Sequence, residues 1–211
     1  FYQLSFNMKL FLILILTLSA YLSSQDYLDY PHPYHSTETT KGMVVSQNYL
    51  SSDIGAEILS KGGNAVDAAI AVGFSLTATL PRAGNIGGGG FMLVYDKKTE
   101  SIISFDFRSM SPKLATPDVY KVNGVHQYEL SEEGYKAIAV PGTVAGLIEA
   151  HEMFGTMDLA DLVNPTIELL KEGVPVTDDL YWAINDTESL KNDPESKKIS
   201  VSYTHLRAHE T

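Results

Sequence analysis

Apolar and polar positions follow a helical period in the early part of the chain. In "SSDIGAEILSKGG", the isoleucine and leucine residues recur at helical spacing, which predicts a helix. Ser51, Ser52 or Asp53 is expected as its N-cap, because short polar side chains accept hydrogen bonds from the first free N–H groups of a helix. Gly62 and Gly63 are expected to end it, since glycine readily adopts the left-handed conformation that closes many helices.

The following segment, "AVDAAIAVGFSLTATL", is apolar on nearly all sides and predicts a buried helix. Asn64 is placed to cap this helix, and Asp67 stands three residues later in the position of a capping-box acid. Its many alanine and glycine residues would let another element approach closely. Pro81 is expected to end it, because proline cannot continue a helix without losing a hydrogen bond.

Two β-rich stretches come next along the chain. "FMLVYD" (residues 91–96) and "SIISFDF" (residues 101–107) flank the polar "KKTE", which predicts a β-hairpin. "RSMSPKLATP" then indicates a loop. A short buried strand is also predicted at residues 43–46, in "KGMVVSQNYL".

Three further helices are predicted towards the end of the chain. "GTVAGLIEAHEMFG" predicts a helix closed by Gly155, and "DLADLVNPTIELLKEG" predicts one opened by Asp158 with Pro165 as a kink or break. "VTDDLYWAINDTESL" predicts the third. Helices packed on an antiparallel sheet indicate a layered α+β or sandwich architecture.

Composition excludes several classes of function. The chain has 211 residues, 44% of them hydrophobic, which is typical of an ordinary globular protein of one or two domains. Its formal net charge of −11 repels phosphate backbones and anionic headgroups, so neither nucleic acid nor a membrane surface is an expected partner. The absence of cysteine excludes disulfides, thiolate metal sites and a cysteine nucleophile.

The N-terminal residues predict export. In "MKLFLILILTLSA", a lysine follows Met8, a short apolar run comes next, and small residues close the stretch, as in a secretory signal peptide. We assign residues 1–24 to this signal, with the residues before Met8 preceding the true start, and residues 25–41 to a linker. The apolar run is shorter than the roughly 20 residues that span a bilayer. The expected location is the periplasm or the cell exterior, with no membrane contact beyond the signal.

The C-terminal string "VSYTHLRAHET" (residues 201–211) follows an abrupt change after "ESKKIS" and resembles translated sequencing-adapter read-through. We expect it to be a non-native tail and the chain to be a fragment of a longer protein. His205 and His209 are four residues apart, but zinc normally needs three or four protein ligands, so no metal site is predicted there. His32 and His35 are assigned to the solvated linker.

Four consecutive glycines (Gly87 to Gly90) in "AGNIGGGGFMLVYD" raise the possibility of a phosphate loop. A dinucleotide-binding loop follows a strand and opens a helix, whereas here a predicted helix precedes the glycines and a predicted strand follows them. A Walker loop needs Lys and Ser or Thr after its last glycine, and Phe91 and Met92 stand there instead. The run therefore predicts either an unusual φ or a close approach of two backbones.

Several long strings resemble the γ-glutamyltranspeptidase family. "KGGNAVDAAIAVGFSLTATLPRAGNIGGGGFMLVYD" resembles the signature of the family's large subunit. "DFRSMSP" (residues 106–112), "VPGTVAGLIEAHEMFGTM" (residues 140–157) and the opening "GMVVSQNYLSSDIGAEIL" fit the same family, in order and with few gaps. The resemblance covers residues 42–190, and residues 42–200 are assigned to the large-subunit portion of a precursor.

The resemblance implies an N-terminal-nucleophile hydrolase with a four-layer αββα sandwich, of which this chain supplies a part. In the family a zymogen cleaves itself by autoproteolysis, and the new N-terminal threonine of the small subunit becomes the nucleophile. Its free α-amine acts as the base that a threonine otherwise lacks. That threonine would lie in a C-terminal half beyond this chain. Thr143 and Thr156 show no processing site before them, so no catalytic residue is assigned here and the chain alone is expected to be inactive.

Arg108 is the substrate-binding residue that the resemblance implies. In the family, the arginine of the "DFR" motif holds the α-carboxylate of the γ-glutamyl group, a task that suits the planar guanidinium fork. A surface ion pair between Arg108 and Asp106 is the alternative. Relatives commonly carry glutamate after this arginine, where a carboxylate could orient it, whereas this chain has Ser109, whose hydroxyl can hydrogen-bond nearby only more weakly.

The resemblance also implies the partners and the rival functions. Expected partners are γ-glutamyl substrates such as glutathione, acceptor amino acids or peptides, and the small subunit of the same precursor. No cofactor is expected, since the threonine, its amine and oxyanion donors suffice. One alternative is a glutaryl or cephalosporin-type acylase on the same scaffold. Another is an exported binding protein that has lost catalysis.

Overall fold

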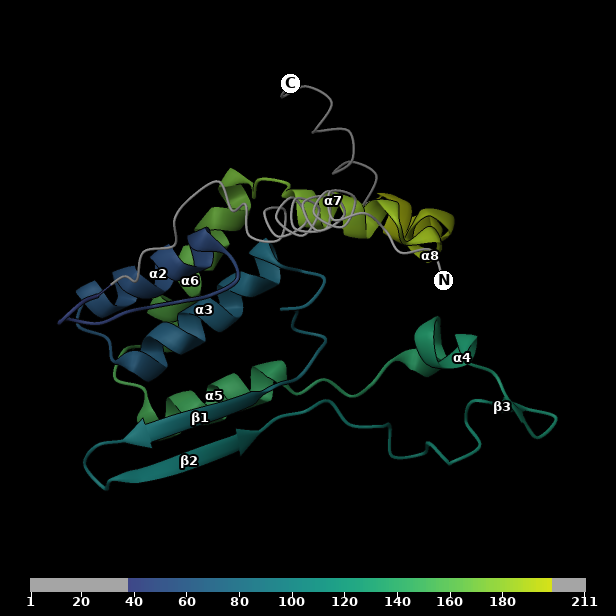
Figure 1. Ribbon diagram of the computed structural model, residues 1–211, viewed down its shortest axis with the longest axis horizontal. Coiled ribbons are helices and arrows are strands. Elements are labelled where there is room, and N and C mark those ends of the chain that lie inside the picture. The colour runs from purple at the N-terminus through teal and green to yellow at the C-terminus, as the bar shows by residue number, and fades with distance from the viewer. Residues whose placement is uncertain (1–37, 199–211) are drawn as a thin grey trace, which may run out of the picture. The chain divides into compact units, whose positions relative to one another are not determined.

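The computed structural model describes residues 38–198 (Figure 1). The chain divides into two units, residues 1–40 and 41–211, and the fold below belongs to the second. The predicted signal peptide, most of the predicted linker, the predicted tail and the four histidines discussed with them lie outside the described residues. Those assignments therefore stay predictions.

The first helix, α2 (Tyr49–Ser60), begins two residues before the earliest predicted cap, Ser51. Its N-cap is Asn48, whose side-chain oxygen accepts a hydrogen bond from the Leu50 N–H at 2.9 Å. The prediction of Ser51, Ser52 or Asp53 was wrong because the serine hydroxyls make other contacts. Ser51 is buried against the Thr79 hydroxyl and Ser52 bonds Ser46. The predicted end is confirmed, with Gly62 at φ +97° directly after the C-cap.

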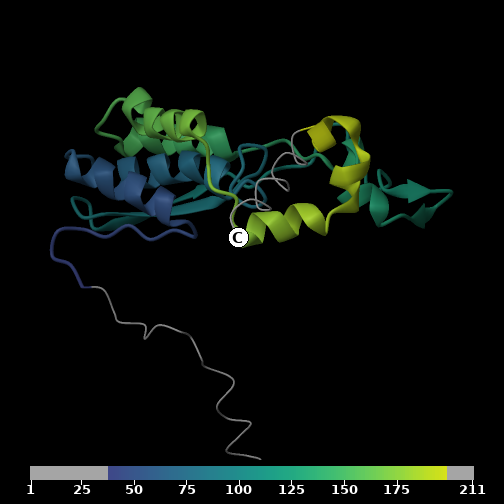
Figure 2. The ribbon, with the colours of Figure 1, turned by 90° about the horizontal axis from the view of Figure 1, so that it is seen from above.

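The second helix, α3 (Ala65–Thr79), confirms the predicted capping box. The Asn64 side chain accepts from the N–H groups of Val66 and Asp67, and the Asp67 carboxylate accepts from the Asn64 N–H. The helix is buried along most of its length and ends before Pro81. It packs against α2 and α6, so α3 is the central helix of its layer (Figures 1 and 2).

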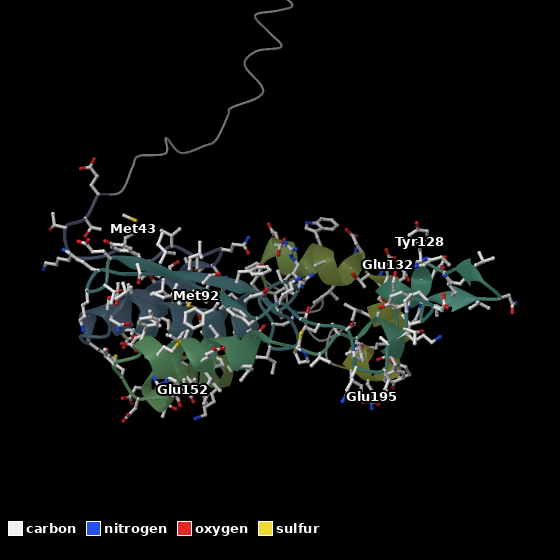
Figure 3. The ribbon with its side chains drawn as sticks, turned by 90° about the horizontal axis from the view of Figure 1, so that it is seen from below. Met43, Met92, Tyr128, Glu132, Glu152 and Glu195 are labelled. Carbon is white, nitrogen blue, oxygen red and sulfur yellow. The ribbon has the colours of Figure 1, made fainter. Side chains whose placement is uncertain are left out.

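Strands β1 (Phe91–Asp96) and β2 (Ser101–Asp106) form the predicted antiparallel hairpin, with Phe91 paired to Asp106 and Asp96 paired to Ser101. One face of the hairpin packs against the core of α3 and α5 and carries Met92, Val94, Ile103 and Phe105 (Figure 3 labels Met92). The other face is exposed, and its large apolar side chains are Phe91 (68% exposed), Leu93 (73%), Tyr95 (62%) and Ile102 (70%). We call these four residues the outer sheet face.

Residues 43–46 do not form the predicted buried strand. Exposure alternates as in a strand, but Met43 and Val45 are 51% and 81% exposed, and only the Val44 side chain packs against the core (Figure 3 labels Met43). The reason is that a strand needs a neighbouring strand. Within residues 38–198, no backbone group of residues 43–45 pairs with another backbone group.

Helices α5 (Thr143–Phe154) and α6 (Leu159–Glu172) match their predictions, closed by Gly155 and opened by Asp158 respectively. Pro165 lies inside α6, which continues past it without a break. The third predicted helix is two helices, α7 (Asp178–Asn185) and α8 (Glu188–Asn192). No helix in the described part of the chain is long and apolar enough to cross a bilayer.

A small second hairpin and two short helical turns were not predicted. The hairpin consists of β3 (Lys121–Val122) and β4 (Val125–His126), joined by Asn123 and Gly124, both with positive φ. "NG" is the usual sequence of a two-residue hairpin turn, so this signal was available in the sequence. Helix α4 (Glu129–Glu132) and the 3₁₀ turn η1 (Tyr135–Ala137) follow (Figure 1; Figure 3 labels Tyr128 and Glu132).

The fully buried carboxylate of Asp67 joins α3 to the loop between α5 and α6. Besides the Asn64 N–H at 2.9 Å, it accepts from the Thr156 N–H at 2.9 Å, the Thr156 hydroxyl at 2.5 Å and the Met157 N–H at 3.4 Å. Burial raises the pKa of Asp67, but these hydrogen bonds outweigh burial and hold the pKa below its ordinary value. Asp67 is therefore an ionised anchor for the C-terminal end of α5.

Candidate functional site

Arg108, the predicted substrate-binding residue, lies two residues after the end of β2, and Phe107 between them extends the hairpin by one more pair of residues. The Gly90 N–H donates to the Phe107 carbonyl at 3.3 Å, and the Phe107 N–H donates to the Gly90 carbonyl at 3.1 Å. The last glycine of the run therefore pairs with the residue before Arg108. This pairing places residues 81–90, which we call the glycine segment, beside residues 107–109, which we call the arginine loop.

Gly89 shows why the glycine run has no side chains. A β-carbon built on Gly89 would lie 2.3 Å from the Ser109 nitrogen and 2.6 Å from the Phe107 carbonyl oxygen. These are backbone atoms held by the hairpin, so they cannot move aside easily. The four glycines of the run are not among the residues with positive φ. Of the two predicted explanations, close approach of two backbones is confirmed, and the backbone approached is that of Arg108.

Three glycines pack closely against Phe107. A β-carbon on Gly142 would lie 2.1 Å from the Phe107 carbonyl oxygen, and one on Gly146 would lie 2.1 Å from the Phe107 ring. A β-carbon on Gly90 would also overlap the ring, at 2.8 Å. Gly142 and Gly146 belong to the start of α5, so this helix packs directly on the residue before Arg108. The sequence analysis did not predict that Gly142 and Gly146 pack on Phe107. The available signal was the spacing of the two glycines in "VPGTVAG", one helical turn apart.

The start of α5 is fastened to the glycine segment as well. Gly142, the N-cap, has no side chain to satisfy the free N–H groups of the helix. The Gly88 carbonyl does so instead, accepting from the N–H groups of Gly142 at 2.8 Å and Thr143 at 3.2 Å. The Thr143 hydroxyl donates to the Asn85 carbonyl at 3.2 Å. Glycine segment, arginine loop and α5 thus form one packed unit.

The Arg108 side chain is exposed at the surface of this unit. Its backbone N–H donates to Asp106 Oδ1 at 3.0 Å, and its Nη1 donates to the Ser109 hydroxyl at 3.1 Å. Among the described residues, no carboxylate forms an ion pair with the guanidinium. The alternative of an Arg108–Asp106 side-chain pair is therefore not observed, because the Asp106 carboxylate binds the backbone instead.

This arrangement suits recognition of a carboxylate. The guanidinium keeps four of its five N–H donors without a partner among the described residues, and its backbone is fixed by the glycine segment and by α5. A free carboxylate can accept two parallel charge-assisted hydrogen bonds from such a fork. Ser109, which stands where relatives commonly have glutamate, accepts one hydrogen bond and adds no negative charge.

A mostly apolar groove lies beside this unit, with Gly89, Gly90 and Phe107 in its lining. It has a volume of about 470 Å³ and runs between α3, residues 43–45, the glycine segment and the start of β1. Its lining is mostly apolar, and Arg108 is not part of it. A charged substrate would lose hydration there without gaining a partner. Across residues 38–198, no cluster of acidic or histidine side chains is placed to bind a metal.

The two threonines considered as substitute nucleophiles are structural donors. The Thr143 hydroxyl bonds the Asn85 carbonyl, and the Thr156 hydroxyl bonds the Asp67 carboxylate. Both backbone nitrogens also donate hydrogen bonds as ordinary peptide N–H groups. Neither residue has the free α-amine that would activate its hydroxyl.

Comparison with known proteins agrees with this geometry. A sequence profile of the family described as gamma-glutamyltranspeptidase matches residues 51–210. The glutathione hydrolase proenzyme of Bacillus subtilis (strain 168) is 41% identical over 160 residues, which are 75% of this chain and 27% of that protein. The chain thus spans about a quarter of the length of this curated relative.

Solved structures show the same fold. The crystal structure of the γ-glutamyltranspeptidase of Helicobacter pylori is 37% identical, with a TM-score of 0.74 over 78% of this chain and 47% of that chain. The cephalosporin acylase from Bacillus halodurans is 30% identical, with a TM-score of 0.67 over 81% of this chain and 32% of that chain. The predicted fold class is confirmed as a partial N-terminal-nucleophile hydrolase fold.

Proposed function

The chain belongs to the gamma-glutamyltranspeptidase family, and we propose that the full-length protein transfers the γ-glutamyl group of glutathione and related γ-glutamyl amides. The acceptor is water in hydrolysis and an amino acid or peptide in transfer. The proposal is supported by family membership and by a relative whose name is glutathione hydrolase proenzyme. The observation that carries it is the guanidinium of Arg108, fixed in its backbone and without an acidic partner among the described residues.

In this proposal Arg108 holds the α-carboxylate of the donor. Two charge-assisted hydrogen bonds fix the carboxylate end and leave the γ-carbonyl available to a nucleophile supplied from outside this chain. The nucleophile is a threonine outside this chain, released as an N-terminus by autoproteolysis of the zymogen. Its α-amine takes the proton from its hydroxyl, whose oxygen bonds the γ-carbonyl carbon while the amide C–N bond breaks and the leaving amine receives the proton. Water or an acceptor amine then attacks the γ-glutamyl ester, and its proton returns to the threonine oxygen.

The small subunit of the same precursor is the proposed partner of the outer sheet face. A two-stranded hairpin with four large apolar side chains exposed is marginal by itself, since stable sheets need more strands or a second packed layer. Covering these side chains would complete the second sheet layer of the sandwich. Residues 43–45 have an extended backbone with no backbone partner inside residues 38–198, so they are a second place where further strands can join.

Export is part of the proposal because of the signal-like residues 1–24. The enzyme would act in the periplasm or outside the cell. Fusion of residues 8–41, starting at Met8, to an alkaline phosphatase lacking its own signal tests this: phosphatase activity outside the cytoplasm is expected, and activity absent from the exported fraction would contradict it.

The activity is tested by expressing the full-length protein and supplying γ-glutamyl-p-nitroanilide. Cleavage into two subunits and release of nitroaniline are expected. The 211-residue chain alone should show neither, because it lacks the proposed nucleophile. A full-length protein that folds and binds γ-glutamyl compounds but does not turn them over would instead identify an exported binding protein.

The acylase alternative has one observation in its favour, the structural likeness to the cephalosporin acylase. The higher identity to glutathione hydrolase proenzymes favours γ-glutamyl donors. Glutaryl amides keep the carboxylate that Arg108 would bind and lack only the α-amino group, so Arg108 alone does not distinguish the two substrate classes. A side-by-side assay of γ-glutamyl- and glutaryl-p-nitroanilide separates the two, with preference for the γ-glutamyl compound expected.

A further inference from the structure

Arg82 and Asp179 form an ion pair that differs from the others in the described part of the chain. Arg82 Nε donates to Asp179 Oδ2 and Arg82 Nη2 donates to Asp179 Oδ1, each at 2.6 Å, across 97 positions of sequence. Between described residues, the other five ion pairs each join side chains three or four positions apart. Of these six pairs within residues 38–198, only this one connects distant segments.

The pair joins α7 to the start of the glycine segment. Asp179 lies in the first turn of α7, after the N-cap Thr177. Arg82 lies two residues before Gly84, whose missing β-carbon would overlap Leu76 of α3 at 2.8 Å. A shift of the segment that begins at Pro81 would therefore also disturb its packing against α3.

A continuous chain of contacts leads from Arg82 to Arg108. The Asn85 side-chain amide donates to the Pro81 carbonyl at 3.2 Å, and the Asn85 carbonyl accepts from Thr143. Three residues later the Gly88 carbonyl holds the start of α5, and Gly89 packs against the Arg108 backbone. A displacement at Arg82 would therefore reach Arg108 through bonded and packed groups.

We propose that Arg82 and Asp179 are positioning residues, which fasten α7 to the glycine segment and so hold the Arg108 loop in its donor-binding position. The fork-to-carboxylate geometry fixes both distance and orientation, which a single contact would not. The expected effect on KM rests on the proposed function, because it assumes that Arg108 binds the donor. The physical tie between α7 and residues 81–90 stands apart from it.

The pair should contribute a small attraction whose strength depends on the salt concentration. Hydrogen bonding to Arg82 lowers the pKa of Asp179, and the same contact raises the pKa of Arg82, so both groups stay charged through the neutral range. The side chains are 50% and 47% exposed. Salt therefore weakens the attraction, and exposed pairs are generally of small energy.

The test uses charge reversal in the full-length protein, with Arg82→Asp, Asp179→Arg and the double variant. Hydrogen exchange of residues 81–90 reports the tie directly, and KM and kcat for γ-glutamyl-p-nitroanilide report its effect on donor binding. Each single variant should speed exchange in this segment and raise KM about threefold, with kcat nearly unchanged. The double variant should recover most of both. Recovery is expected to be incomplete, because an arginine in the first turn of α7 opposes the helix dipole.

Lys61→Glu is the matched control, since Lys61 forms an equally short ion pair with Glu57 at 2.6 Å and both side chains are 52% exposed. It should change neither exchange in residues 81–90 nor KM. Unchanged exchange in the single variants, or a double variant no better than the worse single, would overturn the proposed tie. Faster exchange with unchanged KM would overturn the positioning role. Wild-type protein without γ-glutamyl turnover would refute the proposed function, and exchange would still decide the tie.

Discussion

Gly89 and Ser109 are in such close contact that a β-carbon on the glycine would lie 2.3 Å from the serine nitrogen. The glycine run is thus a backbone surface against which the arginine loop rests. Its sequence resembles a phosphate loop in composition alone. Because the glycines have no side chains, the backbone of the arginine loop can pack directly against them. This contact explains the glycine run without a bound ligand.

Replacing Gly89 by alanine should therefore displace the Arg108 loop. Overpacking against fixed backbone typically costs about 1–3 kcal/mol, and the shifted loop should also raise KM for a γ-glutamyl donor. Thermal unfolding and donor kinetics of the full-length protein measure both effects. Gly87→Ala is the control in the same run, because its β-carbon would meet only the movable Asn85 side chain, at 3.2 Å. Equal stability and equal donor KM in the two alanine variants would show that the contact between Gly89 and Ser109 does not position Arg108.

Asp67 should stabilise the fold through its charge. Asp67→Asn removes a fully buried carboxylate that accepts four hydrogen bonds, at an expected cost of about 2 kcal/mol. The pKa of Asp67 is lower in the folded state than in the unfolded state. Its contribution is therefore complete above the unfolded pKa and is lost as pH falls through the folded pKa.

Thermal unfolding of wild type and Asp67→Asn between pH 7 and pH 3 checks this direction. The difference between their midpoints should be largest near neutrality and should shrink towards acid. Asp53→Asn, an exposed change in α2, is the control and should have little effect at any pH. A difference that grows as the pH falls would contradict the assignment.

The outer sheet face should be buried in the full-length protein. Leu93→Lys places a charge at a side chain that is 73% exposed in this chain, so the isolated chain should tolerate it. The full-length protein should not, because the covering layer would have to bury the charge. Soluble yield and subunit cleavage are the measurements. Leu170→Lys, on the exposed side of α6, is the comparison, and equal behaviour of the two in the full-length protein would argue against the proposed interface.

Local signals in the sequence predicted much of this fold. The Asn64 and Asp67 capping box, the Gly62 helix end and the β1–β2 hairpin depend on neighbouring residues, and the structure confirms all of them. The Asn48 cap was missed because three later polar residues competed for the role. One of these, Ser51, is occupied by a partner 28 positions away, which no local pattern reveals.

Features that depend on distant contacts could not be predicted. Residues 43–46 have the composition of a strand, but pairing needs a partner that the described residues do not supply. The holding of Phe107 by Gly142 and Gly146 requires α5 to pack on the end of β2, across more than 30 positions. Arg108 itself was identified from family resemblance, since an exposed arginine after a strand has no distinctive local pattern.

The most direct test of the account is the kinetics of Arg108→Lys in the full-length protein with γ-glutamyl-p-nitroanilide. Lysine keeps the charge but loses the two-pronged contact, at an expected cost of about 2 kcal/mol, or roughly a 30-fold higher KM with a smaller change in kcat. Any turnover of 4-aminobutyryl-p-nitroanilide, the analogue that lacks the α-carboxylate, should be affected much less. A donor KM equal to that of the wild type would show that Arg108 does not bind the substrate.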